Sequence, residues 1–277
     1  TGLKQQLKTA LWQSQSGKEV YERLKLIEPK VNEYWSKVDR TLIRKYLRVG
    51  TIPFTMLFHD EYKAYESVLA LLDKIIKIDV PSIKKFRSET LEASSRMLLL
   101  LSESDTKSIH KIAKDLGINI KTIIDFLSVL EKAELLIRIY PHGSVHKKVR
   151  KPAKYLFMSP TIRAAFLNLL GGETLLEQNK GKLFEDSIGL YLYKEFIVPG
   201  VATVSYDPNQ NSADFIIRFV NDKSIVLEVG LGSKGCVQTK NTMKRTPSKY
   251  GLVVSSKELA LVEENIVKVP IEFFLLA

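Results

Sequence analysis

The spacing of apolar residues changes along this chain, and that change limits its fold more than any other feature. In the first 48 residues, apolar side chains such as Leu7 and Leu11 recur every three or four positions, which is typical of amphipathic helices. Further on, short apolar runs alternate with turn-forming residues, which predicts strands over 201–206, 213–220 and 224–229. We therefore expect an α+β multidomain protein, and 277 residues, 45% of them hydrophobic, suffice for two or three domain cores.

The charge of the chain is positive and unevenly distributed. The net charge is +11, and residues 1–180 hold 31 Lys and Arg against 20 Asp and Glu, whereas 181–277 hold 11 of each. A cationic face attracts nucleic acid by neutralising phosphates, although it also attracts acidic proteins or keeps a protein in solution. Charge alone therefore leaves DNA binding open.

Several classes of protein are excluded or disfavoured. The longest apolar stretches, such as 97–101 and 273–277, are far shorter than the roughly 20 residues that span a bilayer, so we expect no membrane partner. The single cysteine, Cys236, excludes an internal disulfide framework and indicates a cytoplasmic location. The start at Thr1-Gly2 has neither Met nor the layout of a secretory signal, and we interpret it as a cut end.

The most specific pattern lies in the middle of the chain. Residues 105–108 provide a helix start, Gly117 predicts a tight turn, and Asn119 can cap a second helix that runs to about residue 130. Strands are predicted at 135–140 and 155–158. Helix, glycine turn, helix and hairpin in this order predict a winged helix-turn-helix, whose second helix enters the major groove of DNA.

Two groups of residues are candidates for DNA contact. On the outer face of the second helix few polar side chains are available and Asp125 is acidic, so we expect weak sequence-specific readout. The loop between the strands is basic and contains no acidic residue, which favours phosphate contact. The alternatives are a solvated loop and a domain that serves only protein interaction or spacing. The candidate DNA-binding residues are Lys121 and Thr122 on the helix and Lys147, Lys148, Arg150, Lys151 and Lys154 in the loop.

Three carboxylates in the last third of the chain are candidates for a metal site. Asp214 begins one predicted strand, Glu228 ends the next, and Glu185 lies on the preceding helix. Carboxylates brought together at strand ends are suitable ligands for Mg²⁺ or Mn²⁺, which could activate water for attack on a phosphodiester. The alternative is that Glu185 and Asp214 are an ordinary helix-surface residue and an ordinary strand-edge residue.

These motifs resemble known families. The segments Phe184-Glu185, Ala213-Asp214-Phe215 and Leu227-Glu228-Val229-Gly230-Leu231-Gly232-Ser233-Lys234 resemble the PD-(D/E)XK restriction-endonuclease-like fold. Residues 41–277 resemble the C-terminal half of archaeal and bacterial AAA-type P-loop ATPases, which place a winged helix and this nuclease-like domain after the ATPase core. The resemblance implies a helical connector at 1–90, a winged helix at 91–160 and a mixed α/β nuclease-like domain at 175–277. It also implies an ATPase core in the same chain or in a partner chain.

The chain departs from these families in two ways. It contains no Gly-x-x-x-x-Gly-Lys-Ser/Thr motif, so we expect no nucleotide site in these residues. At the Glu-x-Lys motif it has Glu228-Val229-Gly230, which leaves Lys234 as the candidate catalytic lysine. The leading hypothesis is therefore a DNA-binding region of an ATPase with an inactive nuclease-like domain. The alternatives are a metal-dependent endonuclease that uses Glu185, Asp214, Glu228 and Lys234, and a protein-interaction scaffold.

Overall fold

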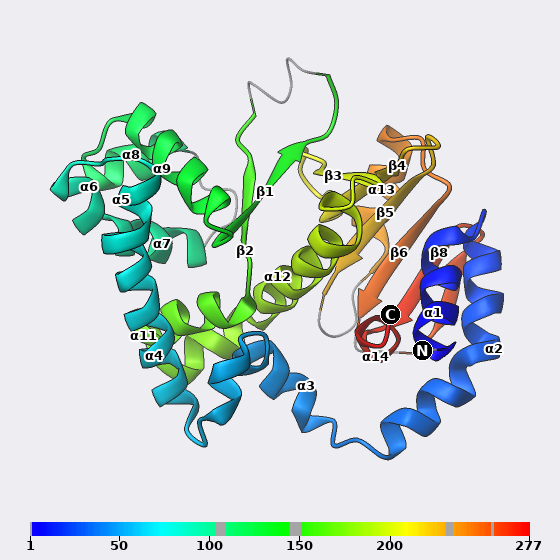
Figure 1. The fold of residues 1–277 in the computed structure, drawn as a ribbon. Coiled ribbons are helices and arrows are strands. Elements are labelled where there is room, and N and C mark those ends of the chain that lie inside the picture. The colour runs from blue at the N-terminus through cyan, green and yellow to red at the C-terminus, as the bar shows by residue number, and fades with distance from the viewer. Residues whose placement is uncertain (1, 104–108, 145–150, 231–234, 256–257) are drawn as a thin grey trace. The chain divides into compact units, whose positions relative to one another are not determined.

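The computed structural model describes residues 2–103, 109–144, 151–230, 235–255 and 258–277 (Figure 1). It confirms that the chain has an α+β fold. The chain divides into two compact units: the first combines Thr1–Leu42 with Lys194–Ala277, and the second is the continuous segment Ile43–Tyr193.

Six strands form the sheet of the first unit, in the order β3-β4-β5-β6-β8-β7. Strands β3, β4 and β5 form an antiparallel meander, β5, β6 and β8 run parallel, and β7 is antiparallel to β8. Every residue of β5 and β6 is buried, as expected for central strands covered on both faces. The strands are β3 (Ala202–Tyr206), β4 (Phe215–Phe219), β5 (Ser224–Val229), β6 (Tyr250–Ser255), β7 (Ala260–Glu263) and β8 (Ile266–Pro270).

The N-terminal helices belong to this sheet unit. Helix α2 (Gly17–Ser36) packs on β6, β7 and β8, and α1 (Gly2–Gln13) packs on α2. The Lys223 side chain donates hydrogen bonds to the carbonyls of Trp12 and Ser14 at distances of 2.8 and 2.6 Å, which ties the end of α1 to the sheet. The other helices of the unit are α13 (Val237–Arg245) and α14 (Ile271–Leu275). Two short helices, α3 (Thr41–Lys45) and η4 (Tyr193–Ile197), lie where the chain passes between the units.

This arrangement corrects the predicted connector at 1–90. Residues 1–42 fold with the C-terminal sheet, and only the remainder of the predicted connector belongs to the second unit. The periodicity correctly indicated buried helix faces, but it carries no information about which distant segment covers them. The last strands, β7 and β8, were not predicted, whereas the predicted meander at 201–229 is present.

The second unit is mainly helical and contains one hairpin. Its strands β1 and β2 are antiparallel, with Leu136 opposite Phe157. Gly171 and Gly172 interrupt α11, and Gly172 has φ +57, a conformation that favours glycine. The elements are η1 (Tyr46–Gly50), η2 (Pro53–Leu57), α4 (Glu61–Lys74), η3 (Ile75–Asp79), α5 (Val80–Ile83), α6 (Ser88–Glu92), α7 (Ser94–Glu103), α8 (Ile109–Leu116), α9 (Ile120–Lys132), β1 (Leu136–Pro141), β2 (Lys154–Phe157), α11 (Pro160–Gln178) and α12 (Lys180–Leu192).

The expected absence of membrane-spanning segments has one structural test. Among the helices of the described residues, none combines the length and the apolar character needed to cross a bilayer.

Candidate nucleic-acid interface

Helices α8 and α9 meet at the tight turn that the sequence predicts. Gly117 has φ +67, and the Ile118 amide donates to the Ala113 carbonyl at 3.1 Å, which closes the end of α8. The Asn119 side chain accepts a hydrogen bond of 2.8 Å from the Lys121 amide, which confirms the predicted N-cap of α9. The predicted helix start at 105–108 lies outside the described residues.

A groove of about 910 Å³ opens beside this turn. One wall comes from the segment 84–96, and the other comes from 116–125. The predicted DNA-binding residues Lys121 and Thr122 both line it. The charged residues of its lining are Lys84, Lys85, Arg87, Arg96 and Lys121, against Glu89, Glu92 and Asp125.

Most of the basic side chains of this groove have no carboxylate partner. Lys84 forms an ion pair of 2.8 Å with Asp125. The four other cations, Lys85, Arg87, Arg96 and Lys121, form no ion pair within the part of the chain that the structure describes. The segment Lys84-Lys85-Phe86-Arg87, with three cations in four residues, could have indicated this wall from the sequence. It was not predicted to be part of a site.

The predicted wing is described only in part. Lys147, Lys148 and Arg150 lie outside the described residues, and Lys151 is exposed. The prediction that Lys154 contacts DNA is wrong, because this side chain is only 6% exposed and its ammonium bonds to the carboxylate of Glu185. Lys154 pairs with Ile139 across the hairpin, and all four residues of β2, which packs against α12, are buried.

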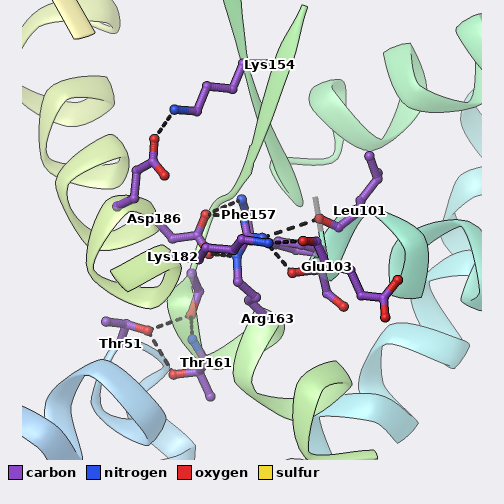
Figure 2. Close-up of polar contacts among 12 residues, drawn as sticks. Thr51, Leu101, Glu103, Lys154, Phe157, Thr161, Arg163, Lys182 and Asp186 are labelled. Carbon is purple, nitrogen blue, oxygen red and sulfur yellow. Dashed lines mark hydrogen bonds and ion pairs between the residues drawn. The ribbon is translucent and has the colours of Figure 1, made fainter. Parts of the chain in front are cut away.

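A second polar cluster fixes the hairpin to the helices of its unit (Figure 2). The guanidinium of Arg163 on α11 binds both carboxylate oxygens of Asp186 on α12, with N–O distances of 2.6 and 2.9 Å. Asp186 also accepts from the Phe157 amide of β2 at 3.0 Å. Arg163 donates to the carbonyl of Ser102, near the end of α7, at 2.9 Å. One buried ion pair therefore connects four elements.

Neighbouring contacts extend this cluster. Lys182 donates to the carbonyl of Glu103, and the hydroxyl of Thr51 lies 2.9 Å from that of Thr161 (Figure 2). The Arg163–Asp186 pair was not predicted from the sequence. The available signal was a charged residue inside a run of otherwise apolar helix, since residues 160–167 are all buried.

The three candidate carboxylates do not form the expected set. The ladder between β4 and β5 pairs Phe215 with Leu227, which brings Asp214 and Glu228 to the same strand ends. Asp214 accepts from the Val229 amide at 2.7 Å, and Glu228 is fully buried. Glu185 belongs to the other unit and pairs with Lys154, and Lys234 lies outside the described residues. Among the residues that the structure describes, no group of three His, Cys, Asp or Glu could hold a metal ion.

The fold and the groove define an α+β protein whose second unit carries two helices joined by a tight turn, a hairpin and a basic groove. Residues 40–172, which include the groove, match a family model described as a domain of unknown function, DUF8612. The chain is 36% identical over 244 residues to the uncharacterized protein MJ1637 of Methanocaldococcus jannaschii. That alignment covers 87% of the chain and 50% of the relative, so the chain spans about half the length of the curated relative it matches. No solved structure matches the chain.

Proposed function

We propose that the second unit binds duplex DNA as a winged helix, with its main phosphate contacts in the groove beside the α8–α9 turn. The observation that carries this proposal is the gathering of Lys85, Arg87, Arg96 and Lys121 around the N-terminal turn of α9. In winged helices the first turn of the second helix approaches base edges while basic side chains around it bind phosphates. The first turn of α9 and the cations beside it both line the groove, which supports this proposal.

Electrostatics favours a polyanion as the ligand of this groove. The five cations of the lining outnumber its three carboxylates, and phosphates that approach the four cations outside the Lys84–Asp125 pair neutralise this excess charge and release counterions. Two separate segments of about ten residues each line the groove. The backbone of a duplex, with its regularly spaced charges, satisfies several of these cations at once.

Removal of the four cations tests the proposal. The variant Lys85→Ala, Arg87→Ala, Arg96→Ala and Lys121→Ala should bind a random-sequence duplex at least about tenfold more weakly near 0.1 M salt. A plot of the logarithm of its binding constant against the logarithm of the salt concentration should become shallower, by roughly one unit of slope for each phosphate that the protein no longer neutralises. The control variant removes Lys63, Lys74, Lys132 and Lys180, which are exposed and lie outside the groove. Fluorescence anisotropy measures both, and an equal weakening in the two variants would contradict a specific role of the groove.

We further propose that this DNA-binding region serves an ATP-driven machine, as the resemblance to AAA-type ATPases implies. The 277 residues contain no P-loop, so nucleotide hydrolysis would depend on other parts of the protein or on a partner. The length of the relative, of which the chain spans half, leaves room for such a core. The complete reading frame tests this point: a P-loop upstream supports it, and its absence both there and in every copurifying protein contradicts it.

The second candidate function is a metal-dependent DNA endonuclease. One observation favours it, namely that the β4–β5 ladder brings Asp214 and Glu228 to the same strand ends. The described residues do not fit a three-carboxylate centre, and Gly230 stands where active relatives of the fold have lysine. We therefore expect no nicking of plasmid DNA with Mg²⁺ or Mn²⁺. Robust Mn²⁺-dependent cleavage that Glu228→Gln abolishes would replace the leading proposal with this one.

A further inference from the structure

Asp125 is the acidic residue that α9 contributes to the groove, where five cations face three carboxylates. It lies on α9 one helical turn after Lys121 and Thr122, and both of these residues line the groove with it. Its side chain is 33% exposed, and its Oδ2 lies 2.8 Å from the Nζ of Lys84 on the opposite wall. A negative charge at this place weakens phosphate binding, so its presence in a DNA groove needs an explanation.

The ion pair keeps both side chains charged and hydrogen-bonded to each other. The hydrogen bond from Lys84 lowers the pKa of Asp125 below its usual value, so the carboxylate stays ionised at neutral pH. An ionised carboxylate only accepts hydrogen bonds. Lys84 meanwhile differs from the other cations of the groove because its ammonium already has an anionic partner.

The pair is not required to hold the two walls together. Phe86, which follows Lys84 by two residues, packs its ring edge to face against Phe126 of α9, with ring centroids 5.3 Å apart. Phe126 is fully buried in the core of the unit. Since this apolar contact anchors the segment, a variant that breaks the exposed ion pair should still fold.

We propose that the Lys84–Asp125 pair is a selectivity device for base recognition in the major groove. This inference rests on the proposed DNA-binding function. On most sequences Asp125 retains Lys84 and repels nearby phosphates, which keeps binding weak. Where a C·G pair faces α9, the exocyclic amine of cytosine donates to Asp125, and Lys84 is released to bind a phosphate. A single exchange of partners thus couples base readout to backbone affinity.

The exchange is chemically balanced in hydrogen bonds and charge. Before binding, the ammonium of Lys84 donates to the carboxylate of Asp125. Afterwards, the cytosine amine donates to Asp125 and Lys84 donates to a phosphate oxygen, so each charged group exchanges one hydrogen-bond partner for another. A thymine or guanine edge offers only acceptors, and on adenine the N7 acceptor beside the N6 amine repels the carboxylate, so the pair stays closed on these bases.

Asp125→Asn separates this proposal from a purely structural role. The variant releases Lys84, so binding to a random-sequence duplex pool should tighten about fivefold or more, and the log–log salt slope should rise by about one unit. Selection from a randomised duplex library should recover cytosine at one position with the wild-type chain. With the variant, the preference should move towards adenine, because an amide pairs with the N6 and N7 of adenine.

Two further variants complete the experiment. Lys84→Gln should weaken pool binding less in the wild-type background, where Asp125 holds Lys84, than in the Asp125→Asn background, where Lys84 is free to bind phosphate. Asp73→Asn, which breaks the exposed Lys77–Asp73 pair of 2.8 Å outside the groove, makes the same change in charge and should leave selectivity unaltered.

The outcomes distinguish this inference from the proposed function. If Lys121→Ala weakens duplex binding but Asp125→Asn does not strengthen it, the selectivity device is wrong and the proposed function stands. An unchanged base preference in Asp125→Asn overturns it as well. A wild-type chain that binds no duplex overturns the proposed function and the device together.

Discussion

Arg163 and Asp186 are fully buried charges in the second unit, and the bonds that they form decide how the hairpin is held. A buried ion pair contributes little net stability relative to apolar residues, but the removal of one partner leaves a charge without compensation. Asp186 has an additional role as the acceptor for the Phe157 amide. We infer that this pair defines the position of the hairpin relative to α11 and α12.

Arg163→Met should therefore destabilise the second unit strongly. The expected decrease in the free energy of unfolding is about 3–5 kcal/mol, because the Asp186 carboxylate remains buried without its cation. The double variant Arg163→Met with Asp186→Asn should recover part of this decrease, since no unpaired charge remains. Urea unfolding followed by circular dichroism measures both. A double variant less stable than Arg163→Met would contradict this account of the pair.

Asp207 gives the first unit a predictable response to acid. Burial alone would raise the pKa of this carboxyl, but the Arg245 guanidinium and two hydrogen bonds from Asn209 outweigh burial and hold the pKa below its usual value. Because the pKa of this carboxyl is lower in the folded state than in the unfolded state, where it is about 3.9, the ionised carboxylate stabilises the fold at pH values above the unfolded pKa. This stabilisation is lost as the pH falls through the folded pKa. The stability advantage of the wild type over Asp207→Asn should therefore be full above about pH 5 and shrink below about pH 4. Chemical unfolding across this range measures it, and a constant difference would contradict the assignment.

Lys154 shows why single residues are difficult to assign from sequence. It follows a run of basic residues and was predicted to bind phosphate, yet it lies in a strand whose four residues are all buried, and it pairs with Glu185. Lys121, by contrast, was correctly predicted to face outward, because the helical period and the Asn119 cap fixed the phase of α9. In both cases the residue type correctly indicated a positive charge. The local geometry decided whether the side chain is exposed or buried in an ion pair.

The turn between α8 and α9 is the element on which the groove depends. Gly117 has φ +67, and a Cβ there would meet no atom within 4 Å, so only the backbone conformation requires glycine. Gly117→Ala should lower the free energy of unfolding by about 1–2 kcal/mol. Gly117→Asn should cost less, because asparagine tolerates the left-handed conformation better. Thermal unfolding of both variants tests this, and an equal destabilisation would show that steric crowding decides.

Local patterns predicted most elements of the described chain. The α8–α9 turn, the hairpin and the meander of β3, β4 and β5 follow from periodicity, glycine and capping residues that act within a few positions. Strands β7 and β8 were not predicted, and the sequence of β7, three apolar residues followed by Glu263, does not alternate between apolar and polar positions. The groove itself could not be predicted, since its walls are segments about 30 residues apart.

The two units share the positive charge of the chain. The second unit holds 24 Lys and Arg against 17 Asp and Glu, and the first holds 18 against 14. The larger excess therefore belongs to the unit with the basic groove, although the discontinuous first unit is also cationic. Sequence order concealed this division, because residues 1–42 fold with a sheet that begins 160 residues later. Apolar faces predict burial, but long-range pairing depends on the whole fold.

Site-specific photocrosslinking tests the central claim, that DNA lies in the groove beside α9, most directly. A benzophenone amino acid is introduced in place of Thr122, which lines the groove, and in a separate control in place of Leu26, which is 81% exposed in the first unit. Both proteins are irradiated with a labelled duplex at the same fraction bound. We expect a covalent protein–DNA adduct from position 122 and at most a trace from position 26. Equal adducts from the two positions, or duplex binding without any adduct from position 122, would contradict the account.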